Sequence, residues 1–324
     1  MRDRAAHHDA EASLPLDDLA ALRDAGALYA SDEDTHDLLV LLGRGNPALG
    51  RLMEAHINAV LLVRRYGTQA QAERCQEEAK AGRLFGLWVT DAPGAAVRLR
   101  GGALHGTKAP CSGVGAVDVV LTTVETDDGS VMALVPVEAL RTEPMPPIAG
   151  MRAARQGRAV FDGTPCPPGA LVGAPGDYLR EPDLSCGAWR TSAITLGVLD
   201  ALVDALRDHL RARRHTDAPL QQERFGRVLI AQGTARMWVD AACRASGAET
   251  LPVPDRVARV NLARVAVELA CLTALPLVQR SAGLAAFVPG PLERIARDLA
   301  TYLRQPAPDA VLTEAAAHAL GGEP

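Results

Sequence analysis

The sequence predicts an α+β protein in three parts: an N-terminal α-helical domain, a small central antiparallel β domain and a C-terminal four-helix bundle. The expected boundaries are residues 1–84, 85–175 and 176–324. Two observations predict this order. Apolar residues recur at intervals of three and four before residue 84 and again after residue 188, as in amphipathic helices. From Phe85 apolar and polar residues alternate instead, as in short half-buried strands.

Length and composition are those of an ordinary globular protein. The 324 residues suffice for two or three domains, and the net charge of −5 argues against a nucleic-acid partner. Six cysteines are scattered without a CxxC pair, which argues against a metal site and predicts free thiols. The first residues lack the apolar core of a secretion signal, and we expect no membrane span, so the predicted location is the cytoplasm.

The first part is expected to be helical from Pro15, after a polar and irregular stretch at residues 1–13. Further helices are predicted over residues 35–42, 49–66 and 68–82. Gly67 ends the longest of these patterns. His56 lies within it, and a packed histidine is the favoured interpretation over a metal ligand.

Six strands are predicted in the central part, over residues 85–90, 97–100, 103–109, 117–124, 131–137 and 157–163. The second and third meet at Gly101 and Gly102, a pair suited to a tight hairpin, and the sequence Asp-Asp-Gly at 127–129 predicts another turn. This spacing predicts a compact antiparallel module of short strands.

The chain after residue 188 is predicted to be helical to its end. Long helices are expected over residues 188–215, 219–246, 255–281 and 291–303, with a short tail helix over 309–320. Long helices joined by short loops predict an antiparallel bundle.

Five sequence segments at the joints of this layout resemble the acyl-CoA dehydrogenase family of flavoproteins. They are YGTQAQ (66–71, with Gly82 beyond), WVTDAPG (88–94), LHGTKAPCSG (104–113), QRSAG (279–283) and PLERIARD (291–298). Each is weak alone, but they occur in the family's order over roughly residues 14–310. The resemblance implies the family's fold, and we interpret Arg297 and Asp298 as a structural pair on the last bundle helix.

The same resemblance implies an FAD site. Trp88, Val89 and Thr90 would lie at the isoalloxazine ring, with the Thr90 hydroxyl on its edge. Ser112 would lie near the reactive ring nitrogen. A flavin ring needs such hydrogen-bonding groups along its edges. Considered alone, Thr90 is better explained as a strand threonine and Ser112 as a turn serine; only within the matched segments is the flavin role favoured.

Gln279 and Gly283 would contact the adenine or pyrophosphate end of FAD, in this family often across a subunit interface. The implied substrate is an acyl-CoA or a similar small molecule. The implied partners are an electron-transfer flavoprotein or a flavin reductase, and further copies of the chain in a homodimer or homotetramer.

The chain departs from the family's pattern where the catalytic base is expected. Acyl-CoA oxidation needs a carboxylate to remove a proton next to the thioester carbonyl. The two positions that carry this Glu in the family correspond here to Pro306 and Trp189. The other candidates are Glu181, Asp183, Asp309 (also a predicted helix cap) and Glu314. None is assigned, so the catalytic residue is unknown.

A second departure is Pro110, which stands where the family has a flavin-shielding aromatic residue.

Three functions are compatible with these features. The first is an FAD-dependent oxidoreductase of the acyl-CoA dehydrogenase type. The second is a flavin-dependent monooxygenase of the same fold, which needs no Glu base. The third is a catalytically degenerate homologue that serves as a binding or scaffold subunit.

Overall fold

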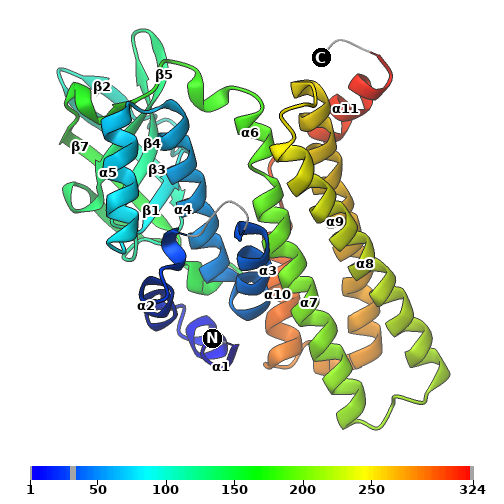
Figure 1. The fold of residues 1–324 in the computed structure, drawn as a ribbon. Helices are drawn as coiled ribbons and strands as arrows, with labels where there is room; N and C mark the ends of the chain where they lie inside the picture. The colour runs from blue at the N-terminus through cyan, green and yellow to red at the C-terminus, as the bar shows by residue number, and fades with distance from the viewer. Residues whose placement is uncertain (1, 30–33, 322–324) are drawn as a thin grey trace.

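Five α-helices precede the sheet in the computed structural model, which describes residues 2–29 and 34–321 (Figure 1). They are α1 (Arg2–Ala10), α2 (Leu16–Asp24), α3 (Thr35–Gly45), α4 (Pro47–Tyr66) and α5 (Gln69–Lys80). Asn46 caps α4 by accepting bonds from two backbone amides of its first turn, and Thr68 and Gln71 form a capping box on α5. The predicted helices are confirmed with small shifts of their ends.

The prediction of an irregular segment at residues 1–13 is wrong, because α1 occupies most of it. Arg4 of α1 forms an ion pair with the buried Asp18 of α2. Asp9 at the other end of α1 pairs with Arg297, with 2.6 Å between Oδ2 and Nη2. These long-range contacts stabilise a helix whose own sequence has no apolar face.

Eight strands form one sheet in the order β6-β7-β3-β2-β4-β5-β8, with β1 also beside β4. They are β1 (Phe85–Trp88), β2 (Arg98–Arg100), β3 (Ala103–Cys111), β4 (Val119–Thr126), β5 (Gly129–Pro136), β6 (Arg141–Pro144), β7 (Gly157–Pro165) and β8 (Leu171–Val172). The predicted strands are present, and β6 and β8 are additional. Gly101 and Gly102 have φ of +57° and +78°, as a tight turn between β2 and β3 requires.

The sheet is mixed, not purely antiparallel as predicted. β1 pairs with β4 in parallel, from Phe85 opposite Val119 to Trp88 opposite Thr122. Hairpins force adjacent strands to run antiparallel, but the β2–β3 hairpin lies between β1 and β4 in the chain. The direction of that pair is therefore set by packing, which strand periodicity does not report.

The remaining helices build the predicted bundle, and α3 lies along it (Figure 1). They are α6 (Asp183–Cys186), α7 (Trp189–Ala212), α8 (Pro219–Gly247), α9 (Val253–Ala282), α10 (Pro291–Tyr302) and α11 (Pro308–Ala319). α8 packs along α9, both contact α7, and α11 packs on α9. One continuous hydrophobic core includes residues from α3, the sheet and the bundle, so the helical parts on both sides of the sheet share their interior.

The segment Val253–Ala286 is long and apolar enough to cross a membrane by length and composition, which we did not expect from the sequence. In the structure 44% of its apolar window is buried, and α9 contacts α7, α8 and α11. A central helix of a bundle meets the same criterion, because it is apolar on several faces.

His56 lies at the junction of α4, β1 and the 3₁₀ turn at Ala27–Tyr29. Its Nε2 donates to Leu28 O at 2.8 Å, and its Nδ1 accepts from Phe85 N at 3.0 Å. The ring is 1% exposed, and burial lowers the pKa of His56 to about 4. The interpretation as a packed histidine is confirmed.

We predict that His56 makes stability fall as the pH falls from about 6.5 to about 4. In this window the unfolded chain binds a proton at His56 and the folded chain does not, so acid favours unfolding by up to about 3 kcal/mol. His56→Gln should flatten this part of the pH profile, measured by urea unfolding at pH 4.5 and 7.5. The exposed His105→Gln is the control and should leave the slope unchanged; an equal effect of both variants would contradict the prediction.

Candidate functional site

Residues 88–91, at the end of β1, lie beside residues 108–112, at the end of β3. Ala109 N donates to Thr90 O at 3.0 Å, and Asp91 and Lys108 form an isolated antiparallel bridge. The Trp88 indole Nε1 donates to Ser112 O at 2.9 Å. The structure thus brings together four of the six residues that the resemblance implies for the flavin.

Thr90 and Ser112 present two hydroxyls at this edge. Thr90 is exposed and Ser112 is half-buried, and within residues 2–29 and 34–321 neither hydroxyl has a hydrogen-bond partner. Trp88 is 2% exposed, so its indole supports Ser112 from inside the fold and does not offer a surface of its own. The edge therefore fits the hydrogen-bonding rim of a flavin through Thr90 and Ser112, with Trp88 as a positioning residue.

Lys108 holds the backbone of this edge in place from the interior of the fold. The side chain is 1% exposed, and its Nζ lies 2.7 Å from Asp91 Oδ1, 3.1 Å from Val89 O and 3.0 Å from Thr123 Oγ1. Burial lowers the pKa of Lys108, and the hydrogen bond and charge of Asp91 oppose that effect. The sequence analysis included Lys108 in a motif but assigned it no role. A lysine at an inward-facing position of an alternating strand is the feature that could have indicated this role.

Gln279 and Gly283 lie at the C-terminal end of α9, away from the β strands (Figure 1). Gly283 ends the helix with φ +61° and ψ −138°, and its N–H donates to Gln279 O. A single chain does not bring this pair to the Thr90–Ser112 edge. Their predicted contact with a cofactor requires a second copy of the chain.

The two positions expected to carry a base hold the residues that the sequence indicated. Trp189 begins α7, and Pro306 lies between α10 and α11, where its carbonyl accepts from Arg264 Nη2 at 2.8 Å. Neither side chain is able to remove a proton.

The four alternative carboxylates are engaged or remote. Glu181 accepts from the Ser185 hydroxyl at 2.5 Å, and Asp183 accepts from Tyr66 OH at 2.6 Å. Glu314 is exposed on α11. The prediction that Asp309 caps the tail helix is wrong: Ala307 holds the cap position of α11, and Asp309 lies in the first turn.

A buried polar cluster at α4, α7 and α10 was not anticipated. Glu54, 5% exposed, forms an ion pair with Arg51 and accepts from Asn58 Nδ2 at 2.5 Å. Asn58 in turn accepts from Arg190 Nη1 at 2.9 Å. Tyr302 is buried nearby, and burial and the charge of Glu54 raise the pKa of its phenol. One sequence feature could have indicated this cluster: two polar residues, Glu54 and Asn58, lie four residues apart on the core side of α4. Because Arg51 and Asn58 both bond to the Glu54 carboxylate, this group is not a free base.

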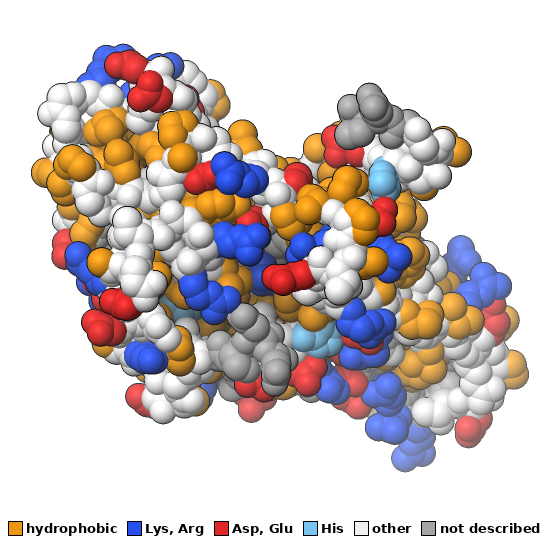
Figure 2. Space-filling view, turned by 45° about the horizontal axis from the view of Figure 1, so that its top comes forward, with side chains coloured by type: hydrophobic (Ala, Val, Ile, Leu, Met, Phe, Trp, Pro, Cys, Tyr) orange, Lys and Arg blue, Asp and Glu red, His pale blue; other side chains and the backbone are white. Residues whose placement is uncertain are grey.

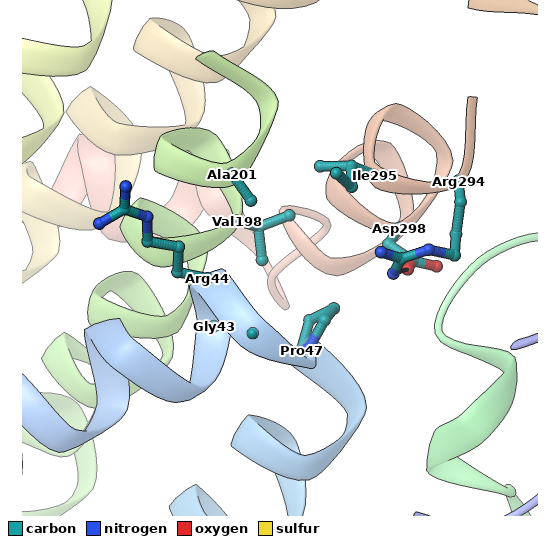
Figure 3. A pocket seen from close by; sticks show the side chains of 9 residues that line it. Gly43, Arg44, Pro47, Val198, Ala201, Arg294, Ile295 and Asp298 are labelled. Carbon is teal, nitrogen blue, oxygen red and sulfur yellow. Dashed lines mark hydrogen bonds and ion pairs between the residues drawn. The ribbon is translucent and has the colours of Figure 1, made fainter. Parts of the chain in front are cut away.

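Figure 3 shows a narrow crevice where Gly43 and Pro47 meet Val198 of α7 and the Arg294–Asp298 pair of α10. Its volume of about 10 Å³ is room for a single water, far too little for a flavin.

Asp298 accepts from Met151 N at 2.7 Å, and Arg297 pairs with Asp9 and Glu293. Arg297 and Asp298 are therefore structural, as interpreted from the sequence.

Figure 2 shows a hollow between the sheet-bearing part of the molecule and α11, with basic side chains along it. The described residues contain no group of three or more His, Cys, Asp or Glu side chains able to hold a metal ion.

Comparison with known proteins identifies the fold. No family model and no curated protein matches the sequence. Among solved structures, KijD3 in complex with FMN and a dTDP-linked amino keto sugar is 20% identical, with a TM-score of 0.85 over 100% of this chain and 91% of that chain. The glutaryl-coenzyme A dehydrogenase glutaryl-CoA complex is 19% identical, with a TM-score of 0.84 over 100% and 92%. Dibenzothiophene monooxygenase (TdsC) from Paenibacillus sp. A11-2 is 16% identical, with a TM-score of 0.83 over 99% and 94%.

These likenesses span nearly the whole of each chain. The protein therefore has the acyl-CoA dehydrogenase-like fold of these flavoproteins, and the fold implied by the five sequence segments is confirmed. Identities near 20% define architecture and leave the reaction to be argued from the site.

Proposed function

We propose that this protein is a flavin-dependent oxidoreductase that works with oxygen, as a monooxygenase, on a small-molecule substrate. The observation that carries the flavin part of the proposal is the Thr90–Ser112 edge. Its two hydroxyls have no hydrogen-bond partner among the described residues, and the nearby Asp91 carboxylate is already paired with Lys108. The fold neighbours that support it include FMN-bound TdsC and a nitrososynthase from Micromonospora carbonacea var. africana.

The residues of the edge would hold and orient the ring. Thr90 and Ser112 donate or accept hydrogen bonds at its rim, Trp88 fixes the Ser112 backbone, and Lys108 fixes the Val89 carbonyl. A bound reduced flavin supplies the two electrons of the reaction, in which one atom of dioxygen enters the substrate and the other leaves as water. The electrons would come from a flavin reductase or a similar partner.

Acyl-CoA dehydrogenation is the second candidate, which the fold and the glutaryl-CoA dehydrogenase likeness favour. It is placed second because it needs a free carboxylate base. Pro306 and Trp189 occupy the two expected positions, and Glu54 is held by Arg51 and Asn58. FAD, as the resemblance implies, and FMN, as in KijD3, both fit an edge that contacts only the ring.

The test starts from the purified protein, whose bound flavin is extracted and identified by mass. Under the proposal the anaerobic protein is not bleached by a panel of acyl-CoAs, whereas the chemically reduced protein is reoxidised by oxygen. Bleaching by an acyl-CoA would establish the second candidate instead. Absence of flavin after reconstitution with both FMN and FAD would leave a flavin-free binding or scaffold protein.

We predict that Thr90→Val and Ser112→Ala each weaken flavin binding by about tenfold, because each removes one hydrogen bond to the ring. The check is flavin fluorescence during titration of the apoprotein. Ser130→Ala, in the β4–β5 hairpin, is the matched control and should bind flavin as the wild type does. Unchanged affinity in both edge variants would refute the assignment of this edge.

Self-association is a further part of the proposal. Ile230 and Met237 on α8 are 71% and 66% exposed, and Leu269 on α9 is 59% exposed. Apolar side chains at this exposure on adjacent helices suit a contact with a second copy. A second copy would also bring its Gln279 and Gly283 to the cofactor.

We therefore predict a homodimer or homotetramer whose mass falls in the Ile230→Asp/Leu269→Asp double variant, measured by sedimentation velocity at micromolar concentration. Leu41→Asp, at a 64% exposed leucine on α3, is the control and should keep the assembly intact. A wild-type monomer at these concentrations would exclude the predicted assembly.

A further inference from the structure

An open groove lies over the loop that follows Thr90 and over the β2–β3 hairpin. Its volume is about 670 Å³, and its wall carries Arg98, Arg100 and His105. We propose that this groove binds a phosphate or diphosphate group. We assign that group to the substrate, an inference that rests on the proposed function.

The strand register places the three basic side chains together. Arg98 and Arg100 are two residues apart on β2, so they lie on the same face, and Arg98 is directly opposite His105 on β3. Leu99 between them packs against the hydrophobic core. Both arginines are exposed, which leaves their guanidinium groups available to the groove.

The arginines have no carboxylate partner in the part of the chain that the structure describes, since no ion pair joins either one to an acidic group. Asp91, the carboxylate of the groove wall, accepts from Lys108 Nζ at 2.7 Å and from Val97 N at 3.1 Å. Glu125 beside Arg98 and Asp162 beside His105 lie on adjacent strands, outside the groove wall. Among the described residues the groove wall therefore carries two guanidinium groups without an ion-pair partner, with Glu125 as the register neighbour of Arg98, which suits a doubly charged anion.

The floor of the groove is rigid. Ala92 N donates to Thr107 O at 2.9 Å, and Thr107 N donates to Ala95 O at 2.8 Å. Gly106 permits this close approach, since a Cβ there would lie 2.6 Å from Ala96 O. The loop is thus held on β3 before any ligand arrives, and a preformed site loses little entropy on binding.

The groove begins at the residue after Thr90, so a phosphate held by Arg98 and Arg100 would direct the attached organic group toward the Thr90–Ser112 edge. A nucleotide-linked or CoA-linked substrate has this layout, with a diphosphate in its middle. The phosphate tail of the flavin has the same chemistry, and the experiment separates the two sources.

The test uses the Arg98→Ala/Arg100→Ala double variant of the full chain. Binding of ADP and of inorganic pyrophosphate is measured by calorimetry, and flavin content is measured by absorbance on the same samples. Arg211→Ala/Arg213→Ala, at the exposed end of α7, removes the same charge elsewhere and is the control.

We expect the affinity for both probes to fall at least about tenfold in the groove variant and to stay unchanged in the control. Unchanged flavin content would then support a substrate phosphate. Loss of flavin together with the probes would overturn the assignment to the substrate and give the groove to the cofactor. Unchanged probe binding would overturn the groove itself. A flavin-free protein that still binds the probes through the arginines would refute the proposed function and keep the phosphate site.

Discussion

Replacing Gly197 by alanine is expected to destabilise the protein by about 3 kcal/mol or more, although alanine favours a helix over glycine. Gly197 lies in the middle of α7, where α3 crosses it. A Cβ at this position would lie 2.1 Å from Val40 O and 2.7 Å from Arg44 N, both backbone atoms of α3. Backbone atoms have no alternative rotamer, so the helices would have to separate along the whole contact.

The reciprocal position supports this expectation. Gly43 of α3 faces α7, and a Cβ there would lie 2.2 Å from Ile194 O. Two glycines, one on each helix, thus set the distance between α3 and α7. Gly43→Ala should have an effect of similar size, and the double variant should cost less than the sum of the two, because the first separation already makes room for the second methyl group.

Gly226 of α8 provides the control, because no described atom beyond its own turns of the helix lies within 4 Å of a Cβ built there. Gly226→Ala should stabilise the protein by roughly 0.5–1 kcal/mol through helix propensity alone. Urea unfolding of the variants measures all of these effects. A Gly197→Ala protein as stable as the wild type would show that α3 and α7 do not cross as closely as described.

Local pattern predicted the elements well and their contacts poorly. The helical periods and the Gly101–Gly102 turn could be predicted from the sequence, because each depends on a few neighbouring residues. The parallel pairing of β1 with β4 could not be predicted, because it depends on the path of the chain between the strands. Helix α1 was missed for the same reason: its ion pairs join it to Asp18 and Arg297.

The same distinction between local sequence and long-range contacts applies to the candidate site. Thr90 and Ser112 were predicted from motifs, since each lies in a short segment with a recognisable order of residues. The Glu54 cluster was not found, because it combines α4, α7 and α10 through side chains that are far apart in the sequence. The basic groove depends on Arg98 lying opposite His105, a consequence of strand register.

Replacing Lys108 by methionine is expected to have the largest effect on the edge itself. The change leaves Val89 O and the Asp91 carboxylate without their ammonium partner, in a place where the lysine side chain is 1% exposed. Breaking a buried pair costs about 3–5 kcal/mol, and the 32% exposure of Asp91 lets water replace part of the loss. We therefore expect a loss of about 2–3 kcal/mol in the free energy of unfolding.

The same variant should bind flavin less tightly than its loss of stability explains. Lys108 holds Val89 O and Asp91 on either side of Thr90, so without it the Thr90 hydroxyl is no longer fixed at the edge. Flavin affinity measured well below the unfolding temperature should fall by at least about tenfold. This separates a positioning role from a purely structural one, which would lower stability and leave the affinity of the folded protein unchanged.

The chain has one other lysine, Lys80 on α5, which is exposed and lies 4.5 Å from the centre of the Tyr29 ring. Lys80→Met makes the same chemical change without a buried partner, and should alter stability by no more than about 1 kcal/mol and flavin affinity not at all. Lys108→Met/Asp91→Asn completes the comparison. Removing the unpaired carboxylate as well should restore part of the lost stability, because the cost of Lys108→Met lies largely in the charge left behind. A double variant no more stable than Lys108→Met would show that the lysine acts through Val89 and Thr123 alone.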